Sequence, residues 1–231
     1  MESLEEAERY LSRSKGVRDA LGIARSARLE ATPIGHGEHN ANFRFSHPET
    51  GKRYVLRLNY ASQLGLERQV SYEANALRVL EPSGRAPKVL FVDDTRAVAS
   101  RGVLVEECVS GSLLDFGNPE MVREAAAIMA DIHALSPSPG CGLMRPADPL
   151  VAQRETCEAY FESYCGSEYA DPCVVRVVED LFDQAKAFGA PSPEAEDCSH
   201  VVNTEAVPSH FIMPIDGAGH LTGPGHMLDW E

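Results

Sequence analysis

The sequence predicts an α+β protein in which strands and helices are segregated along the chain. Apolar and polar residues alternate over short runs within 29–60, a pattern typical of antiparallel strands with one solvated face. From residue 119 onward, apolar residues recur at helical spacing in three long segments separated by breaks. The stretch from Val201 to Glu231 contains two short apolar runs around a loop with four glycines and two prolines, which predicts a closing hairpin.

Composition limits the partners that the protein is expected to have. The chain has 231 residues, which suits one or two domains, and 43% of them are apolar, which is enough for a sizeable core. The formal net charge of −14 argues against nucleic acid and anionic membranes as primary partners. This charge is compatible with a cationic substrate, although many ordinary cytosolic proteins are acidic as well.

The cysteines and the N-terminus bear on the expected compartment. Six cysteines occur without any C-x-x-C spacing, which argues against a zinc site and favours free thiols in a reducing cytosol. The stretch from Met1 to Glu6 is acidic and lacks the apolar core of a signal peptide. No apolar run approaches the roughly 20 residues that a membrane-spanning helix needs. We therefore expect a cytoplasmic protein that does not act at a membrane.

The first expected element is one surface helix over residues 3–22, because Leu4, Ala7 and Leu11 share a helical spacing. Residues 29–60 follow as strands and turns, with the glycine-rich turn GHGEHN at 35–40. Glycine permits close approach of the backbone, so this turn would lay N–H groups over phosphates. On the motif alone, an ordinary hairpin turn is the simpler interpretation.

Arg57 and Glu73 form the most informative pair of charges. Val55 and Arg57 share one face of the strand that contains them. A helix is expected over 65–80, and Glu73 falls inside its apolar stripe, where a carboxylate is costly unless it is paired. Arg57, on the strand that precedes the helix, is a candidate partner. The alternatives are a glutamate that reaches solvent and an arginine that is solvated on an edge strand. The stripe consists of Leu66, Val70, Leu77 and Leu80.

Two more apolar strands, 88–92 and 102–106, precede a domain boundary that we expect near residue 110. Helices are then expected over 119–135, 149–165 and 173–189. The last of these helices is predicted to bury a core face made of Val174, Val177, Val178, Leu181, Phe182 and Ala185.

Polar residues lie at the edges of the closing hairpin, whose strands are expected at Ser209–Met213 and His226–Trp230. Two of them precede the first strand, one lies inside it and one lies inside the second strand. In chain order they are Asn203, Glu205, His210 and Asp229. Two carboxylates and a histidine at one end of a hairpin make a candidate site for metal binding and proton transfer.

The segments VNTEAVPSHFI at 202–212 and LDWE at 228–231 resemble the catalytic region of the aminoglycoside phosphotransferase and choline kinase family. That family has a protein-kinase-like fold. The resemblance implies two lobes: a small antiparallel-sheet lobe over 1–110 that binds nucleotide, and a mostly helical, partial second lobe over 111–231 that carries the catalytic hairpin.

The family pattern is H-G-D-x-x-x-x-N followed, after a hairpin, by an aspartate that binds metal. By resemblance, Asn203 replaces the histidine and would hold the loop, while Glu205 replaces the catalytic aspartate and would orient the substrate hydroxyl. His210 replaces the metal-binding asparagine, and Asp229 is the second metal ligand. Because imidazole suits transition metals better than Mg²⁺, the resemblance implies Mg²⁺ with Mn²⁺ as an alternative, one ion, or none.

The resemblance also assigns an ATP site to the first lobe. Arg57 would hold the phosphates with Glu73 as its partner, and the linker between the lobes would bind adenine through its backbone. The residues assigned to the nucleotide are Gly35, Gly37, Asn40, Val55, Arg57, Glu73, Glu106 and Cys108.

Two functions follow from the resemblance. The first is an ATP-dependent phosphotransferase that acts on a hydroxyl group of a small molecule, which the net charge allows to be cationic. The second is a pseudokinase-like module that binds nucleotide with little or no turnover, because three of the four motif residues differ from the usual types.

The family normally continues for several helices beyond the position of Glu231. The chain is therefore expected to be either a fragment or a natural short form without the usual acceptor pocket. In either case we expect it to be poorly soluble, oligomeric or marginally stable, because helices of the second lobe would keep apolar faces uncovered.

Overall fold

The computed structural model divides the chain into two compact units. One consists of Met1–Leu143 with His200–Glu231, and the other of Met144–Ser199. The residues that the structure describes are 2–37, 39–62, 65–138, 140–146, 148–186, 200–203 and 206–229. The expected boundary near residue 110 stays a prediction.

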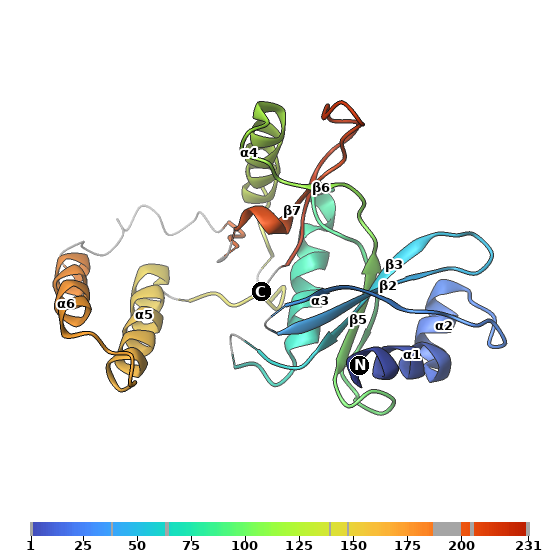
Figure 1. Cartoon of the computed structure of the whole chain (residues 1–231), viewed down its shortest axis with the longest axis horizontal. Helices are drawn as coiled ribbons and strands as arrows, with labels where there is room; N and C mark the ends of the chain where they lie inside the picture. Colours follow the sequence, from blue (N-terminus) through green and yellow to red (C-terminus); the bar gives the residue numbers. More distant parts are fainter. Residues whose placement is uncertain are drawn as a thin grey trace. The chain divides into compact units, whose positions relative to one another are not determined.

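The first unit is built on a five-stranded antiparallel sheet, as the alternating pattern predicts (Figure 1). Each strand pairs with its neighbours through antiparallel ladders, and β2 and β3 run in register from Asn40↔Asn59 to Ser46↔Arg53. In spatial order the strands are β1 (Thr32–His36), β2 (Asn40–Ser46), β3 (Arg53–Asn59), β5 (Gly102–Glu107) and β4 (Val89–Asp93).

One face of the sheet packs on two N-terminal helices, α1 (Glu2–Arg13) and α2 (Lys15–Leu21). The expectation of a single helix over 3–22 is therefore wrong. The break lies at Ser14, whose extended backbone (ψ 106°) leaves the helix and whose hydroxyl accepts the N–H of Val17. Serine competes for backbone donors in this way, and it therefore starts a new helix rather than continuing the first.

The other face of the sheet packs on α3 (Gln69–Leu80), and Figure 1 shows the sheet between α3 and the two N-terminal helices. The apolar stripe of α3 is buried as predicted, with Val70, Leu77 and Leu80 no more than 2% exposed. The helix begins four residues later than expected, and Leu66 lies outside it. A 3-10 turn, η1 (Glu81–Ser83), then ends at Gly84 in the left-handed conformation.

The same core continues into α4 (Pro119–His133), whose apolar face is buried. Within the predicted stripe, Met121, Ala125, Ile128 and Ile132 are buried, whereas Met129 and Leu135 are only partly buried. The helix packs near a small sheet of β6 (Ser112–Leu113), β7 (Phe211–Met213) and β8 (His226–Met227). The order β6-β7-β8 includes the predicted hairpin of β7 and β8, whereas β6 was not expected from the sequence.

The hairpin strands are shorter than predicted. Ser209 and His210 belong to a 3-10 turn, η3 (Pro208–His210), because the proline at its start fixes a turn-compatible backbone. Asp229 follows β8 with a positive φ of 61° and does not lie inside the strand.

The second unit contains α5 (Pro149–Cys165) and α6 (Pro172–Lys186), close to the expected ranges. The rings of Phe161 and Phe182 pack with centroids 5.5 Å apart. No described residue of α6 is buried, so the prediction that this helix buries a core face is wrong. Among the residues that the structure describes, no helix is long and apolar enough to cross a membrane.

Candidate functional site

The predicted pair of Arg57 and Glu73 exists in the structure. Arg57 on β3 faces α3, where Glu73 occupies the buried side of the helix. Arg57 Nη2 lies 3.3 Å from Glu73 Oε2, and the two side chains are 7% and 1% exposed. The partner that the family resemblance assigned to Glu73 is therefore the one that the structure shows. A carboxylate in the middle of the apolar stripe is accommodated because a guanidinium faces it.

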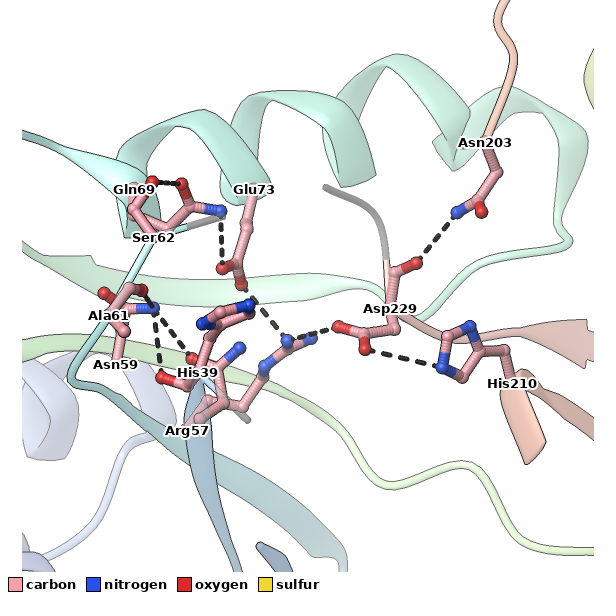
Figure 2. A network of polar contacts seen from close by, with 11 residues as sticks. His39, Arg57, Asn59, Ala61, Ser62, Gln69, Glu73, Asn203, His210 and Asp229 are labelled. Atoms are coloured by element: carbon pink, nitrogen blue, oxygen red, sulfur yellow. Dashed lines mark hydrogen bonds and ion pairs between the residues drawn. The ribbon is translucent and has the colours of Figure 1, made fainter. Parts of the chain in front are cut away.

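Asp229 is the second partner of Arg57, which was not expected. Arg57 Nη2 lies 2.7 Å from Asp229 Oδ1, and the Asp229 side chain is 39% exposed (Figure 2). The contact joins positions 172 residues apart in the chain. A sheet strand, a helix and the end of the closing hairpin thus meet at one guanidinium.

The position of Asp229 is fixed by contacts of the hairpin. Asn203 Nδ2 donates a hydrogen bond of 2.9 Å to the Asp229 carbonyl, as Figure 2 shows. The N–H of Leu228 donates to the His210 carbonyl at 2.7 Å, and His210 Nε2 lies 3.6 Å from Asp229 Oδ2. The structure therefore brings three of the four predicted motif residues together. The fourth, Glu205, lies outside the described residues.

Glu106 adds a third carboxyl group to the surroundings of Arg57. Glu106 on β5 is paired in register with Val55, so its side chain lies on the same face as Arg57. The residue is 6% exposed, and its Oε2 has no hydrogen-bond partner among the described residues. From the sequence, Glu106 was a linker position defined by its backbone, whereas the structure gives its side chain an electrostatic role.

The three carboxyl groups and the guanidinium shift one another's pKa values. Burial raises the pKa of Glu106 to about 7, with Arg57 opposing and Glu73 and Asp229 adding to the rise. Burial also raises the pKa of Glu73, although Arg57 and hydrogen bonds from neighbouring side chains oppose it. Burial alone would lower the pKa of Arg57, but the three carboxyl groups outweigh it and raise that pKa. Arg57 therefore stays charged, as the anchor of the cluster.

The carboxylate of Glu73 is held in place by a chain of hydrogen bonds from an amide and a hydroxyl group. Gln69 Nε2 donates to Glu73 Oε1 at 3.2 Å, and Ser62 Oγ donates to Gln69 Oε1 at 2.6 Å (Figure 2). Gln69 precedes Glu73 by one helical turn, which is the only signal of this contact in the sequence. Ser62 belongs to the loop after β3, and only the fold brings it here.

The glycine-rich turn joins β1 to β2 beside this cluster. Gly37 N donates to the Asn40 carbonyl at 2.9 Å, and Asn40 Oδ1 accepts from Asn59 Nδ2 at 3.0 Å. Asn40 is 5% exposed and also hydrogen bonds to Glu73, so the end of the turn is tied to the charged cluster. A Cβ added at Gly35, in β1 just before the turn, would meet no described atom within 4 Å.

Two further residues predicted to bind the nucleotide lie on β3 and directly after β5. Val55 is half-buried on the Arg57 face of β3. Cys108 directly follows β5, is half-buried with a free thiol, and its N–H donates to the Arg53 carbonyl at 3.3 Å. The linker thus remains attached to the sheet by backbone contacts.

The predicted metal ligands offer a limited set of donors. Asp229 is an oxygen ligand of the kind that Mg²⁺ prefers, and its side chain is partly exposed. His210 presents an imidazole nitrogen, which suits Mn²⁺ better. No group of three or more histidine, cysteine, aspartate or glutamate side chains gathers at a possible ion position within the described part of the chain.

The fold and this charged cluster define a protein of the protein-kinase-like class. The model of the phosphotransferase enzyme family matches residues 30–197, which is well over half of the chain, and the chain belongs to this family. The predicted family and fold class are thus confirmed. No curated protein matches the chain.

Solved structures share this fold at low sequence identity. A protein of Ralstonia eutropha JMP134 classed as an aminoglycoside phosphotransferase has a TM-score of 0.65 and 17% identity, covering 100% of this chain and 64% of its own. Choline kinase from Cryptosporidium parvum Iowa II has a TM-score of 0.63 and 14% identity, covering 87% of this chain and 57% of its own.

Spectinomycin phosphotransferase, solved with ADP and spectinomycin, has a TM-score of 0.55 and 11% identity, covering 91% of this chain and 65% of its own. At these identities the likeness concerns the fold alone. The chain spans less than two thirds of the length of each of these three proteins.

Proposed function

We propose that the protein to which this chain belongs transfers a phosphoryl group from ATP to a hydroxyl group of a small molecule. The observation that carries the proposal is the convergence of Arg57, Glu73 and Asp229 in a chain of the phosphotransferase enzyme family. Phosphoryl transfer depends on positioning and on neutralising phosphate charge, and a buried, always charged guanidinium suits both tasks.

In this proposal Arg57 binds the phosphates and Glu73 holds it in place. A guanidinium has five N–H donors, and both ion pairs of Arg57 use Nη2, so it has capacity for phosphate oxygens. Glu73 is 1% exposed and is itself held by Gln69, which restricts the orientation of the pair. The glycine turn, Val55 and the segment ending at Cys108 would surround the rest of the nucleotide.

The proposed cofactor is ATP with Mg²⁺, and Mn²⁺ is the alternative that His210 favours. Asp229 would hold the ion, which neutralises phosphate charge when it is bound. Asn203 would keep the Asp229 backbone in place through its hydrogen bond to the carbonyl. Glu205 would orient the acceptor hydroxyl, and this role rests on the sequence motif alone.

The proposed acceptor is a small alcohol with a positive charge, and the proposed location of the reaction is the cytoplasm. The net charge of −14 supports attraction of a cation and disfavours nucleic acid and anionic membranes as partners. A phosphorylation assay with labelled ATP and a panel of aminoglycosides, choline, ethanolamine and neutral alcohols tests the proposal. Absence of transfer to every acceptor by the full-length protein would contradict it.

Substitution of the central pair gives a binding test that needs no acceptor. We expect Arg57→Ala and Glu73→Gln to weaken ATP binding by roughly 10-fold to 100-fold, because each removes or misorients a charge-assisted contact. Arg53→Ala is the matched control, since Arg53 lies on the same strand but is exposed and bonds to Ser110. Isothermal titration with ATP would measure the affinities, and equal affinities in all three variants would place the phosphates elsewhere.

A second candidate is a module that binds nucleotide without turnover. The contact of His210 with Asp229, at 3.6 Å, favours it, because a histidine occupies the place of an expected oxygen ligand. A thermal shift with ATP and Mg²⁺ separates the two functions when combined with the transfer assay. A ligand at ~100 times its dissociation constant stabilises the folded state by about 2.7 kcal/mol, so a shift without transfer supports the module.

A further inference from the structure

Arg85 is a charged residue that the proposed chemistry does not use, and it is largely buried. It lies between η1 and β4, and its side chain is 14% exposed. Arg85 Nη1 lies 2.6 Å from Glu124 Oε1, and Arg85 Nε lies 2.7 Å from Asp131 Oδ2, both on α4. The segment that follows α3 is therefore bound to α4 by two charge-assisted hydrogen bonds.

Arg85 and Glu124 also hold the last strand of the hairpin, β8, in place. The backbone carbonyl of Arg85 accepts the N–H of Met227 at 2.7 Å. Glu124 Oε1, which pairs with Arg85, accepts the N–H of Gly225 at 2.8 Å, and Arg85 Nη1 donates to the Gly225 carbonyl at 3.4 Å. Three polar contacts thus fix the backbone of β8 and of the residue before it.

Gly225 shows how closely this segment approaches α4. A Cβ added at Gly225 would lie 2.8 Å from Met213 Sδ, 3.0 Å from Ile128 Cδ1 and 3.2 Å from Glu124 Cγ. A side chain at position 225 would have to displace these side-chain atoms, so glycine suits the close approach of this segment to α4.

The held segment leads directly to Asp229. Met227 is bound to Arg85, Leu228 donates to His210, and Asp229 follows with a positive φ of 61°. A positive φ is unfavourable for a residue with a Cβ, so it persists only where surrounding contacts enforce it. One residue, Leu228, therefore separates Met227, which contacts Arg85, from Asp229, whose carboxylate meets Arg57.

Arg85 also lies five residues after the end of α3, the helix that carries Glu73. One short segment is thus attached to both elements whose carboxylates contact Arg57. We propose that Arg85, together with Glu124, is a positioning residue that sets Asp229 against the guanidinium of Arg57. The positioning stands on the contacts themselves, and its consequence for nucleotide binding rests on the proposed function.

Amide hydrogen exchange in the full-length protein tests the positioning without a ligand. In Arg85→Met we expect exchange at the Met227 and Leu228 amides to accelerate about tenfold or more. The carbonyl that accepts the Met227 N–H remains in this variant, but the segment that carries it loses the side-chain bonds that hold it against α4 and against the Gly225 carbonyl. Amides of the central sheet, such as Leu56, should keep their rates. Unchanged exchange at Met227 and Leu228, or an equal acceleration throughout the sheet, would overturn the proposal.

Arg101→Met is the matched control. It also removes a largely buried arginine, with 29% of its side chain exposed, from an ion pair with Glu6 at 3.5 Å. We expect this variant to leave exchange at the hairpin amides unchanged. If Arg85→Met does not fold, Glu124→Gln serves instead, because glutamine keeps an acceptor for Gly225 but removes the charge that Arg85 binds. Unchanged exchange in Glu124→Gln would likewise overturn the proposal.

A second measurement links positioning to the site. The affinity for ATP is measured with Mg²⁺ and with EDTA, and the ratio reports the contribution of Asp229. In Arg85→Met we expect this ratio to fall toward that of Asp229→Asn, while the affinity in EDTA stays within about twofold of the original. A ratio equal to that of the unsubstituted protein would overturn the proposal. If the unsubstituted protein binds no ATP, the proposed function fails, and the exchange rates alone decide the positioning.

Discussion

Replacement of Glu106 by glutamine should make the protein more stable at neutral and alkaline pH. Glu106 is 6% exposed, and its Oε2 lacks a hydrogen-bond partner within the described residues. Burial raises the pKa of this carboxyl from its ordinary value of 4.5 to about 7. Between about pH 4.5 and 7 the folded protein therefore holds a proton that the unfolded chain has already released.

The size and the direction of the effect follow from linkage. A difference of one pKa unit corresponds to ~1.4 kcal/mol, so a rise of about 2.5 units corresponds to about 3 kcal/mol. Below pH 4.5 both states are protonated and there is no loss. As the pH rises from 4.5 through 7, the folded state loses this amount relative to the unfolded chain, and above 7 the loss is complete.

Urea denaturation of the original protein and of Glu106→Gln at pH 5 and pH 8 measures the difference. Glutamine has nearly the same shape and no charge, so the variant should gain up to about 3 kcal/mol at pH 8 and less than about 1 kcal/mol at pH 5. Arg57 keeps Glu73 and Asp229 as partners in the variant. Parallel pH profiles of the two proteins would refute the inference that Glu106 is an ionisable group buried without full compensation.

Glu107→Gln is the control for this experiment. Glu107 is the next residue of β5, its side chain is 38% exposed, and it pairs with Lys52 at 2.8 Å. Exposed pairs of this kind contribute little, about 0–1 kcal/mol. We expect the change in stability between pH 5 and pH 8 to be the same as in the original protein.

Two further substitutions test the local basis of the fold. Asn118→Ala should destabilise the protein by about 1–2 kcal/mol in urea denaturation, because Asn118 Oδ1 caps α4 by accepting the N–H of Glu120 at 2.9 Å. Asn118→Asp keeps this acceptor and should lose less stability. Equal losses of stability in the two variants would contradict the capping role. Gly111→Ala should cost about 1–3 kcal/mol, because its Cβ would lie 2.7 Å from the carbonyl carbon of Met213 and clash with the attached oxygen, and a thermal melting curve unchanged by the substitution would contradict this close approach.

The pair of Arg57 and Glu73 was predicted from the sequence pattern together with the family resemblance. A charged residue in the middle of an apolar helical stripe requires a partner of opposite charge, and the preceding strand offered one on the correct face. The antiparallel sheet was predictable as well, because the alternation of apolar and polar residues lies within each short segment. The Ser14 break was not predicted, because a side chain that caps a helix competes with an apolar pattern that runs past it.

The contacts between distant segments were decided by the tertiary structure alone. Asp229 reaches Arg57 across 172 residues of chain, and its sequence motif indicated a metal ligand rather than a partner for an arginine. Glu106 was assigned to the nucleotide site because of its position in the linker. The burial of its side chain depends on which elements pack against the face of β5 that carries it. No sequence pattern indicated a role for Arg85, because its partners on α4 and β8 come together only after the hairpin folds back. Periodicity reveals which face of an element is buried, but only the packed fold determines which charges share that buried space.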